Sequence, residues 1–237
     1  MSKSLLVFRC ILSLVLLLSF QATANPVNES DPYETINRSI FSFNQTLDDY
    51  MLKPAAKFYV AVTPDPVERG ISNLFSNLKE ITNASNNLLQ GKASQASVDL
   101  GRFALNSTLG IAGLFDVASS LGLKKTEGED FGQTLGKWGV PAGPYIMLPF
   151  LGPTTLRDAP ARLVDDITDP LDYIDENNHK MAATGLSVVS MRAALLNYDN
   201  MLSGDSYSLI RDVYLQKRAY EVNDGAVEDE FDDLEDY

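Results

Sequence analysis

The chain has 237 residues, a net charge of −13, one cysteine and one histidine. The length suits one large domain or two small ones, and the acid excess argues against a nucleic-acid-binding protein and against electrostatic adhesion to anionic lipid. With so few thiol and imidazole groups, a disulfide framework and an ordinary zinc site are excluded as well.

The first 24 residues are typical of a secretory signal peptide. Lys3 and Arg9 form a positive start, an apolar run covers 11–20, and Ala22-Thr23-Ala24 supplies the small residues before the predicted cut. An uncleaved anchor is the alternative, but an apolar run of about ten residues is short for a membrane span. Because Cys10 precedes the apolar run instead of following it, we expect an N-terminus without an acyl chain.

Three predicted helix starts share an Asp-Pro-x-acid pattern. The Asp can accept unpaired backbone N–H groups at the N-cap, the proline lacks a donor that would be unpaired there, and the acid favours the positive end of the helix. The pattern predicts helices at Asp31-Pro32-Tyr33-Glu34, at Asp65-Pro66-Val67-Glu68 and at Asp169-Pro170-Leu171-Asp172.

Apolar residues three or four positions apart extend the first two starts into amphipathic helices. The first helix should end near Lys53-Pro54 and the second near Gly91, a residue suited to the left-handed position after a helix. The plainest interpretation of the apolar faces, to which Ile36 and Phe43 belong, is that they form an ordinary core.

A third helix should run from about 94 to 106, with Leu100 on its apolar face and Asp99 and Arg102 on the opposite face. The stretch 109–123 that follows is small and apolar. Its glycines make it a poor isolated helix but permit close backbone packing.

Two further helices are expected near the C-terminus. One should run from about His179 to Leu202. The other should begin at an Asp205 cap and continue to about Tyr220, with Arg211 and Arg218 on its outer face.

The predicted fold class is all-α, because no window shows a sustained alternation of apolar and polar residues. We expect one helical domain over residues 25–222. Residues 223–237 are expected to form a disordered acidic tail, since they carry many Asp and Glu side chains and no Lys or Arg.

The stretch from Asp130 to Asp158 stands out because it has no charged side chain between Trp138 and Leu156. A membrane-spanning helix of ~20 residues would need such a run, but four prolines break it: Pro141, Pro144, Pro149 and Pro153. A broken apolar segment can lie at membrane depth only where protein or water pairs its backbone. Two interpretations therefore stay open, a buried core loop and a ribbon of backbone at a lipid boundary.

Residues for catalysis are scarce. His179 lies in a polar stretch typical of a solvated surface, and Gly132 to Lys137 lacks both the spacing and the hydroxyl of a phosphate-binding loop. Asp48-Asp49 and Asp165-Asp166 are adjacent pairs that point different ways on a helix. We therefore predict no enzyme activity, no catalytic residue, no metal and no cofactor.

Several blocks along the chain, in this order, carry a family resemblance: Asp31-Pro32-Tyr33-Glu34 with Asn37-Arg38, Asn73-Leu74-Phe75-Ser76-Asn77-Leu78, Asn87-Leu88-Leu89-Gln90-Gly91, Asp130-Phe131-Gly132-Gln133-Thr134-Leu135-Gly136, Gly143-Pro144-Tyr145 and Arg157-Asp158. Together they resemble the MlaA/VacJ family over roughly Asp31 to Tyr220. Family members are commonly lipoproteins, and the sequence departs from them in having no cysteine after its apolar run.

The resemblance implies a ring-like, α-helical protein in the periplasmic leaflet of a Gram-negative outer membrane. Such proteins pass mislocalised phospholipid from the outer leaflet through a channel to a periplasmic carrier, MlaC-like, and commonly lie beside a trimeric porin. The alternative is a structural scaffold of the outer membrane that recruits a porin or other partners and handles no lipid.

The uncharged stretch and the family resemblance together give two sets of candidate residues. The candidates for the lipid channel or for membrane contact are Phe43, Leu109, Phe115, Trp138, Tyr145, Ile146, Leu148, Phe150 and Leu151. The residues expected to carry the structural motif are Asp31, Pro32, Asn37, Arg38, Gly132, Gly136, Gly143, Arg157 and Asp158.

Overall fold

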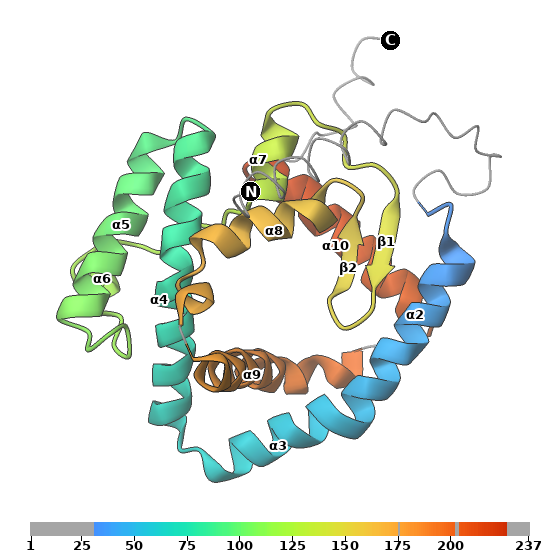
Figure 1. Ribbon diagram of the computed structural model, residues 1–237, viewed down its shortest axis with the longest axis horizontal. Helices are drawn as coiled ribbons and strands as arrows, with labels where there is room; N and C mark the ends of the chain where they lie inside the picture. Colours follow the sequence, from blue (N-terminus) through green and yellow to red (C-terminus); the bar gives the residue numbers. More distant parts are fainter. Residues whose placement is uncertain (1–30, 175, 202–203, 227–237) are drawn as a thin grey trace, which may run out of the picture.

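The computed structural model describes residues 31–174, 176–201 and 204–226. Its elements follow a closed circuit (Figure 1), in which α4 forms one side, α8 and a small hairpin form the top and the opposite side, and α2 and α3 close the bottom. Helix α5 packs against the outer side of α4, and α6 packs against α5. The expected all-α, ring-like domain is confirmed, with one two-stranded sheet added.

The first helix does not end near Lys53-Pro54 as expected. Helix α2 (Glu34–Leu47) passes through a π-helical segment (Asp48–Leu52) directly into α3 (Lys53–Val62). A proline inside a helix lacks a donor and clashes with the carbonyl four residues before it. The wider π turn relieves this conflict, because the Lys53 N–H bonds to the Asp48 carbonyl one residue further back than in an α-helix.

Helices α4 (Asp65–Leu89) and α5 (Ala93–Thr108) form a long antiparallel pair. Gly91 ends α4 with a φ of 79°, in the left-handed position predicted for it. The small apolar stretch after α5 forms turns and the short helix α6 (Val117–Ser120). Gly113 contributes the expected close approach, since a Cβ there would lie 2.7 Å from the Cβ of Asn77.

The stretch from Asp130 to Asp158 is not wholly irregular. It opens with α7 (Phe131–Lys137), and its proline-rich part contains a hairpin of β1 (Tyr145–Leu148) and β2 (Gly152–Thr155), paired antiparallel from Tyr145↔Thr155 to Leu148↔Gly152. Strands of four residues are too short to produce a sustained alternation, which is why the sequence did not predict them.

The remaining elements complete the circuit. Helix α8 (Asp158–Thr168), which was not predicted, leads through a 3₁₀ turn (Pro170–Tyr173) to α9 (Asn177–Leu195). A second 3₁₀ segment (Leu196–Met201) and α10 (Ser206–Val222) follow. The bounds of α10 agree with the predicted helix to within two residues, whereas α9 ends at Leu195 and the rest of its predicted range up to Met201 forms the 3₁₀ segment. His179 is exposed as expected.

The predicted polarity of the helix faces is wrong. On α5, Arg102 is 2% exposed and Asp99 is fully buried, whereas Leu100 is 48% exposed. On α10, Arg218 is buried although it was expected outside. Ile36 and Phe43 of α2 are likewise exposed rather than part of a core. The helical periods were therefore right, but their polar sides face inward.

The apolar core is correspondingly small. One cluster joins Ala56 and Tyr59 of α3 to Ala193 of α9. A second joins Tyr145 and Met147 of β1 to Tyr207 of α10, with Ile40, Phe41, Tyr214 and Leu215 packed around them. These clusters attach α9 to α3 and the hairpin to α10.

The predicted Asp caps have mixed outcomes. Asp169 accepts the Leu171 N–H at 2.9 Å and caps the 3₁₀ turn. Asp65 makes no cap hydrogen bond, and Asp31 lies three residues before α2 as part of a buried network. Asp205 occupies the N-cap position of α10, but its carboxylate pairs with Arg38.

The expected signal peptide, residues 1–24, lies outside the described residues, as do residues 227–237 of the expected tail. The start of the tail is described. There Asp224 forms ion pairs with Lys92, just after α4, and with Lys137, the last residue of α7.

Candidate lipid-contact surface and polar pocket

A buried polar network joins α4 to α5 and α6. The Arg102 Nε lies 2.9 Å from the Glu80 carboxylate, and both side chains are almost fully buried. Asn87 donates to Asp99 at 2.8 Å and Asn77 to the Ser107 hydroxyl at 2.9 Å. Buried charges require partners of this kind, because an unpaired charge costs several kcal/mol or more.

Large apolar side chains lie on the outside instead. Exposed examples come from most elements and include Tyr50, Phe58, Leu109, Ile111, Phe115, Leu121, Leu163, Ile167 and Met181. Exposed apolar area on this scale marks a surface that contacts protein or membrane. Among the described helices, none has the length and apolar character needed to cross a membrane.

Two asparagines of α2 form hydrogen bonds with the backbone along the open edge of the hairpin. Asn37 donates to the Tyr145 carbonyl at 3.1 Å and accepts the Met147 N–H at 2.9 Å. Asn44, seven residues later, donates to the Leu148 carbonyl at 2.9 Å and accepts the Phe150 N–H at 2.8 Å. Side-chain amides thus replace a third strand, which leaves the edge of β1 without open backbone groups at these points.

The hairpin turn presents an apolar tip. Phe150 is 77% exposed and Leu151 is 62% exposed. The ring of Phe43 on α2 meets that of Phe150 edge-to-face with centroids 5.4 Å apart. Backbone without regular secondary structure can lie at membrane depth only where its polar groups have hydrogen-bond partners. The hairpin edge, whose backbone groups are paired by Asn37 and Asn44 and whose tip is apolar, meets this condition.

The candidate contact residues separate into three groups. Phe43, Leu109, Phe115, Trp138, Phe150 and Leu151 are exposed. Ile146 and Leu148 are half-buried. Tyr145 corrects the prediction: it is 0% exposed and packs against the rings of Tyr207 and Tyr214, so it belongs to the core and not to a contact surface.

The motif glycines allow an ion cluster to approach α7. A Cβ at Gly132 would lie 2.5 Å from the Asp158 Oδ1, and one at Gly136 would lie 2.6 Å from an Arg157 nitrogen. Gly143 adopts a φ of 68°, which a larger residue rarely accepts. Gly132 and Gly136 therefore make room for charged side chains.

The other motif residues tie the N-terminal helix to the C-terminal one. Asp31 is buried and accepts from Asn37 at 2.8 Å and from the Tyr207 hydroxyl. Arg38 pairs with Asp205, and its guanidinium lies 4.4 Å from the centre of the Tyr207 ring. Pro32, between Asp31 and the start of α2, is exposed.

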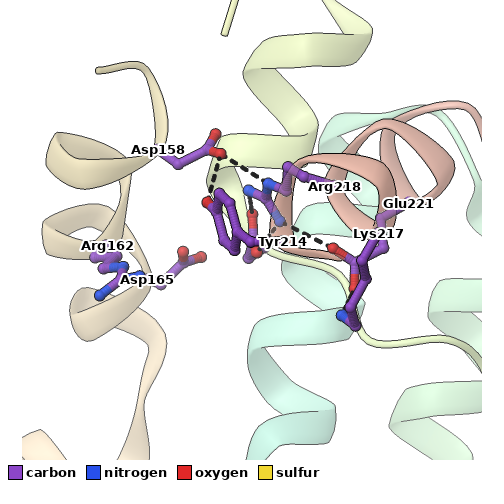
Figure 2. A pocket seen from close by; sticks show the side chains of 8 residues that line it. Asp158, Arg162, Asp165, Tyr214, Lys217, Arg218 and Glu221 are labelled. Carbon is purple, nitrogen blue, oxygen red and sulfur yellow. Dashed lines mark hydrogen bonds and ion pairs between the residues drawn. The ribbon is translucent and has the colours of Figure 1, made fainter. Parts of the chain in front are cut away.

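A polar pocket of about 220 Å³ lies between α8, α10 and the start of α7 (Figure 2). It is lined by Asp130, Asp158, Arg162, Asp165, Tyr214, Lys217, Arg218 and Glu221. Of these residues, only Asp158 is among those expected to carry the structural motif. A signal is present in the sequence, since Arg218 lies four residues after Tyr214 and therefore on the same face of α10.

Arg218 is the centre of this pocket's wall. It binds both oxygens of Asp130 at 2.6 Å. It also binds the Asp158 Oδ2 at 2.8 Å (Figure 2). Burial alone would raise the pKa of Asp158, but the hydrogen bonds from Arg218 and Arg157 outweigh it and lower that pKa to about 2. Asp130 also caps α7 by accepting the Gln133 N–H at 2.9 Å.

Asp165 behaves differently. Its carboxylate accepts the Phe131 N–H at 2.9 Å and an Asn86 N–H at 3.0 Å. Burial, opposed by the Asn86 hydrogen bond and reinforced by the nearby Asp130 carboxylate, raises the pKa of Asp165 to about 6. Within the described ranges, no group of three or more His, Cys, Asp and Glu side chains is placed to hold a metal ion.

The fold and surface define a class: a mainly helical, ring-like domain with a polar interior, an apolar exterior and a clamped hairpin. A family model of the MlaA lipoproteins matches residues 29–221. The chain therefore belongs to the MlaA family.

Individual relatives agree with this assignment. The intermembrane phospholipid transport system lipoprotein MlaA of Escherichia coli K12 is 37% identical over 201 residues, which cover 83% of this chain and 80% of that protein. The protein of the same name from Haemophilus influenzae is 34% identical over 212 residues, covering 87% and 85%. A solved structure from work on the structural basis for maintenance of bacterial outer membrane lipid asymmetry superposes with a TM-score of 0.72 and 38% identity, over 82% of this chain and 100% of that one.

Proposed function

We propose that this protein removes mislocalised phospholipids from the outer leaflet of the outer membrane. They pass through a channel to a periplasmic carrier that is MlaC-like, and lipid asymmetry is thereby maintained. The protein lies in the periplasmic leaflet, beside a trimeric porin. The transfer makes and breaks no covalent bond, so the protein is not an enzyme.

The observation that carries this proposal is the inverted polarity of the helices. Arg102 and Glu80 are paired inside, while Leu100, on the same helix as Arg102, faces out. This distribution suits a surrounding of acyl chains, where helices gain nothing from burying leucine and associate through polar contacts. The family of lipid-transport proteins to which the chain belongs supports the same assignment.

The direct test is genetic and chemical. A strain that lacks the protein should accumulate phospholipid in the outer leaflet of its outer membrane, and the wild-type gene should restore the normal level. Surface labelling of aminophospholipids on intact cells measures the quantity concerned. Protein purified in mild detergent should carry phospholipid that mass spectrometry identifies.

A scaffold that recruits a porin without handling lipid gives a different result. It would co-purify with a porin, carry no phospholipid above the level of a detergent-matched control protein, and leave the outer-leaflet phospholipid unchanged when deleted. That combination would overturn the proposal.

A further inference from the structure

The polar pocket contains one carboxylate that lacks a counter-ion. Asp130 and Asp158 pair with Arg218, and Glu221 pairs with Lys217 and Arg218. In the part of the chain that the structure describes, Asp165 forms no ion pair, although it is half-buried and lies near both the Asp130 carboxylate and the Arg218 guanidinium, which is itself paired with Asp130 and Asp158. Its three N–H contacts come from neutral groups, namely Asn86 and the Phe131 backbone.

A half-buried carboxylate next to a second one is an electrostatically unfavourable arrangement until a cation approaches it. A primary ammonium suits such a site, because it supplies both positive charge and three N–H donors. Figure 2 shows Asp165 on α8, across the pocket from Tyr214 and Arg218 of α10.

Two cations at the rim have donors to spare. Arg162 uses two N–H groups, on the carbonyls of Leu151 at 3.2 Å and Pro153 at 2.9 Å, out of the five that a guanidinium has. Lys217 uses one of its three, on Glu221. Both line the pocket with Asp165, so an anion and an ammonium can be bound in the same cavity.

We propose that this pocket binds a zwitterionic phosphoethanolamine group, with its ammonium at Asp165 and its phosphate at Arg162 and Lys217. The inference rests on the proposed function and deepens it by assigning a headgroup site. The same chemistry occurs in a lipid headgroup and in a free phosphate ester, and the experiment below separates these sources.

The size of the pocket agrees with a headgroup alone. Its volume of about 220 Å³ lies below the roughly 300–1,000 Å³ of pockets that enclose drug-sized ligands. All of its lining residues except Tyr214 are charged, so acyl chains would have to lie outside it. Apolar surface for them is near, since Leu163 and Ile167 of α8 are exposed.

The binding test uses the full mature protein in detergent and titrates it with glycerophosphoethanolamine in a calorimeter. Glycerophosphoglycerol, which lacks the ammonium, and inorganic phosphate should each bind about tenfold more weakly or worse. Asp165→Asn keeps a side-chain oxygen that can accept from Asn86 and Phe131 but removes the negative charge. It should weaken the binding of glycerophosphoethanolamine by about tenfold or more. Lys217→Met should have a similar effect on the phosphate side.

Asp166→Asn is the matched control, because Asp166 neighbours Asp165 but does not line the pocket. It should bind like the wild type. Circular dichroism checks that each variant is folded. If Asp165→Asn does not fold, Lys217→Met serves as the independent test. Equal affinity for all three probes, or equal affinity in wild type and both pocket variants, would overturn the inference.

The source of the ligand is tested with nanodiscs that contain phosphatidylethanolamine or phosphatidylglycerol. A lipid site predicts that Asp165→Asn abolishes the preference for phosphatidylethanolamine nanodiscs, and a site for the free ester predicts loss of binding to the soluble probe only. If deletion of the protein leaves outer-leaflet phospholipid unchanged, the proposed function fails. Headgroup selectivity lost in Asp165→Asn would still support the pocket as a binding site.

Discussion

The side-chain amide of Asn44 holds the backbone of Phe150 at the hairpin tip. Its Oδ1 accepts the Phe150 N–H at 2.8 Å, while its Nδ2 donates to the Leu148 carbonyl at 2.9 Å. Phe150 has a φ of 65°, which side-chain-bearing residues rarely adopt. The contact from α2 therefore stabilises both the open edge and a strained turn.

Replacing Asn44 by Ala should destabilise the protein by about 1–2 kcal/mol, because it leaves a carbonyl and an N–H of the hairpin without partners. Chemical denaturation in detergent measures the free energy of unfolding. Gln45→Ala, at the exposed neighbouring position, should change it by less than about 0.5 kcal/mol. Equal losses in the two variants would contradict the clamp.

A charge at the hairpin should separate lipid contact from core packing. Phe150→Asp and Ile146→Asp should leave the protein folded in detergent but remove it from the outer membrane, since a charge in the bilayer core costs about 2.5 kcal/mol or more. Membrane fractionation and circular dichroism measure the two effects. Asn178→Asp, in the exposed polar stretch before His179, is the control that should keep both properties. Variants that unfold in detergent would favour the core-loop interpretation.

The caps of α4 and α7 should differ in importance. Asp65 makes no cap hydrogen bond, so Asp65→Ala should cost no more than about 1 kcal/mol, through the helix dipole alone. Asp130 caps α7 and also binds Arg218, so Asp130→Ala should cost about 2–3 kcal/mol. Thermal unfolding in detergent compares them, and a larger shift for Asp65→Ala would show that this ranking is wrong.

Stability should fall between pH 4 and pH 7 because of Asp165. Its pKa is raised to about 6 from an ordinary 3.8, so the folded state binds this proton more tightly than the unfolded state. The contribution of Asp165 to the free energy of unfolding is fully present below pH 3.8 and is lost as pH rises through about 6. The loss amounts to at most about 3 kcal/mol. Asp165→Asn should flatten the profile of unfolding free energy in this window.

Asp158 gives the unfolding free energy the opposite pH dependence, at lower pH. Its pKa is lowered to about 2, so its contribution is present above 3.8 and is lost as pH falls towards 2. A profile for Asp165→Asn that still fell between pH 4 and pH 7 would require another group for the transition.

The mature N-terminus should be Asn25 without an acyl chain, because Cys10 lies ahead of the apolar run of the signal. Intact-mass spectrometry of protein from outer membranes measures this directly. An acylated N-terminus, or loss of membrane association on Cys10→Ala, would contradict the prediction.

The sequence predicted the helices well because their signals are local. The spacing of apolar residues placed α4, α5, α9 and α10, and Gly91 marked the end of α4. What failed was the assumption that apolar faces point to a core. Leu100 and Arg102 on α5 have a clear periodicity, but periodicity gives the angle between two faces and not which of them is buried.

The pocket could not be predicted for a related reason. Asp130, Asp165 and Arg218 are 35 to 88 positions apart and lie at the start of α7, on α8 and on α10. Only the packing of α7 against both α8 and α10 brings them together. The hairpin was hidden by its length. Asn37, Arg157 and Asp158, which belong to the family blocks, are buried and hydrogen-bonded.

The π segment between α2 and α3 fixes the number of residues that the chain can have at Asp48–Leu52. A π turn holds one residue more than the α-helical turn it replaces. Deleting one residue there would close this turn to a regular α-helical turn. Pro54 would then clash with the carbonyl four positions before it. In alignments of relatives that keep this proline, we therefore expect insertions and deletions to fall outside 48–52, even where the residue types there vary.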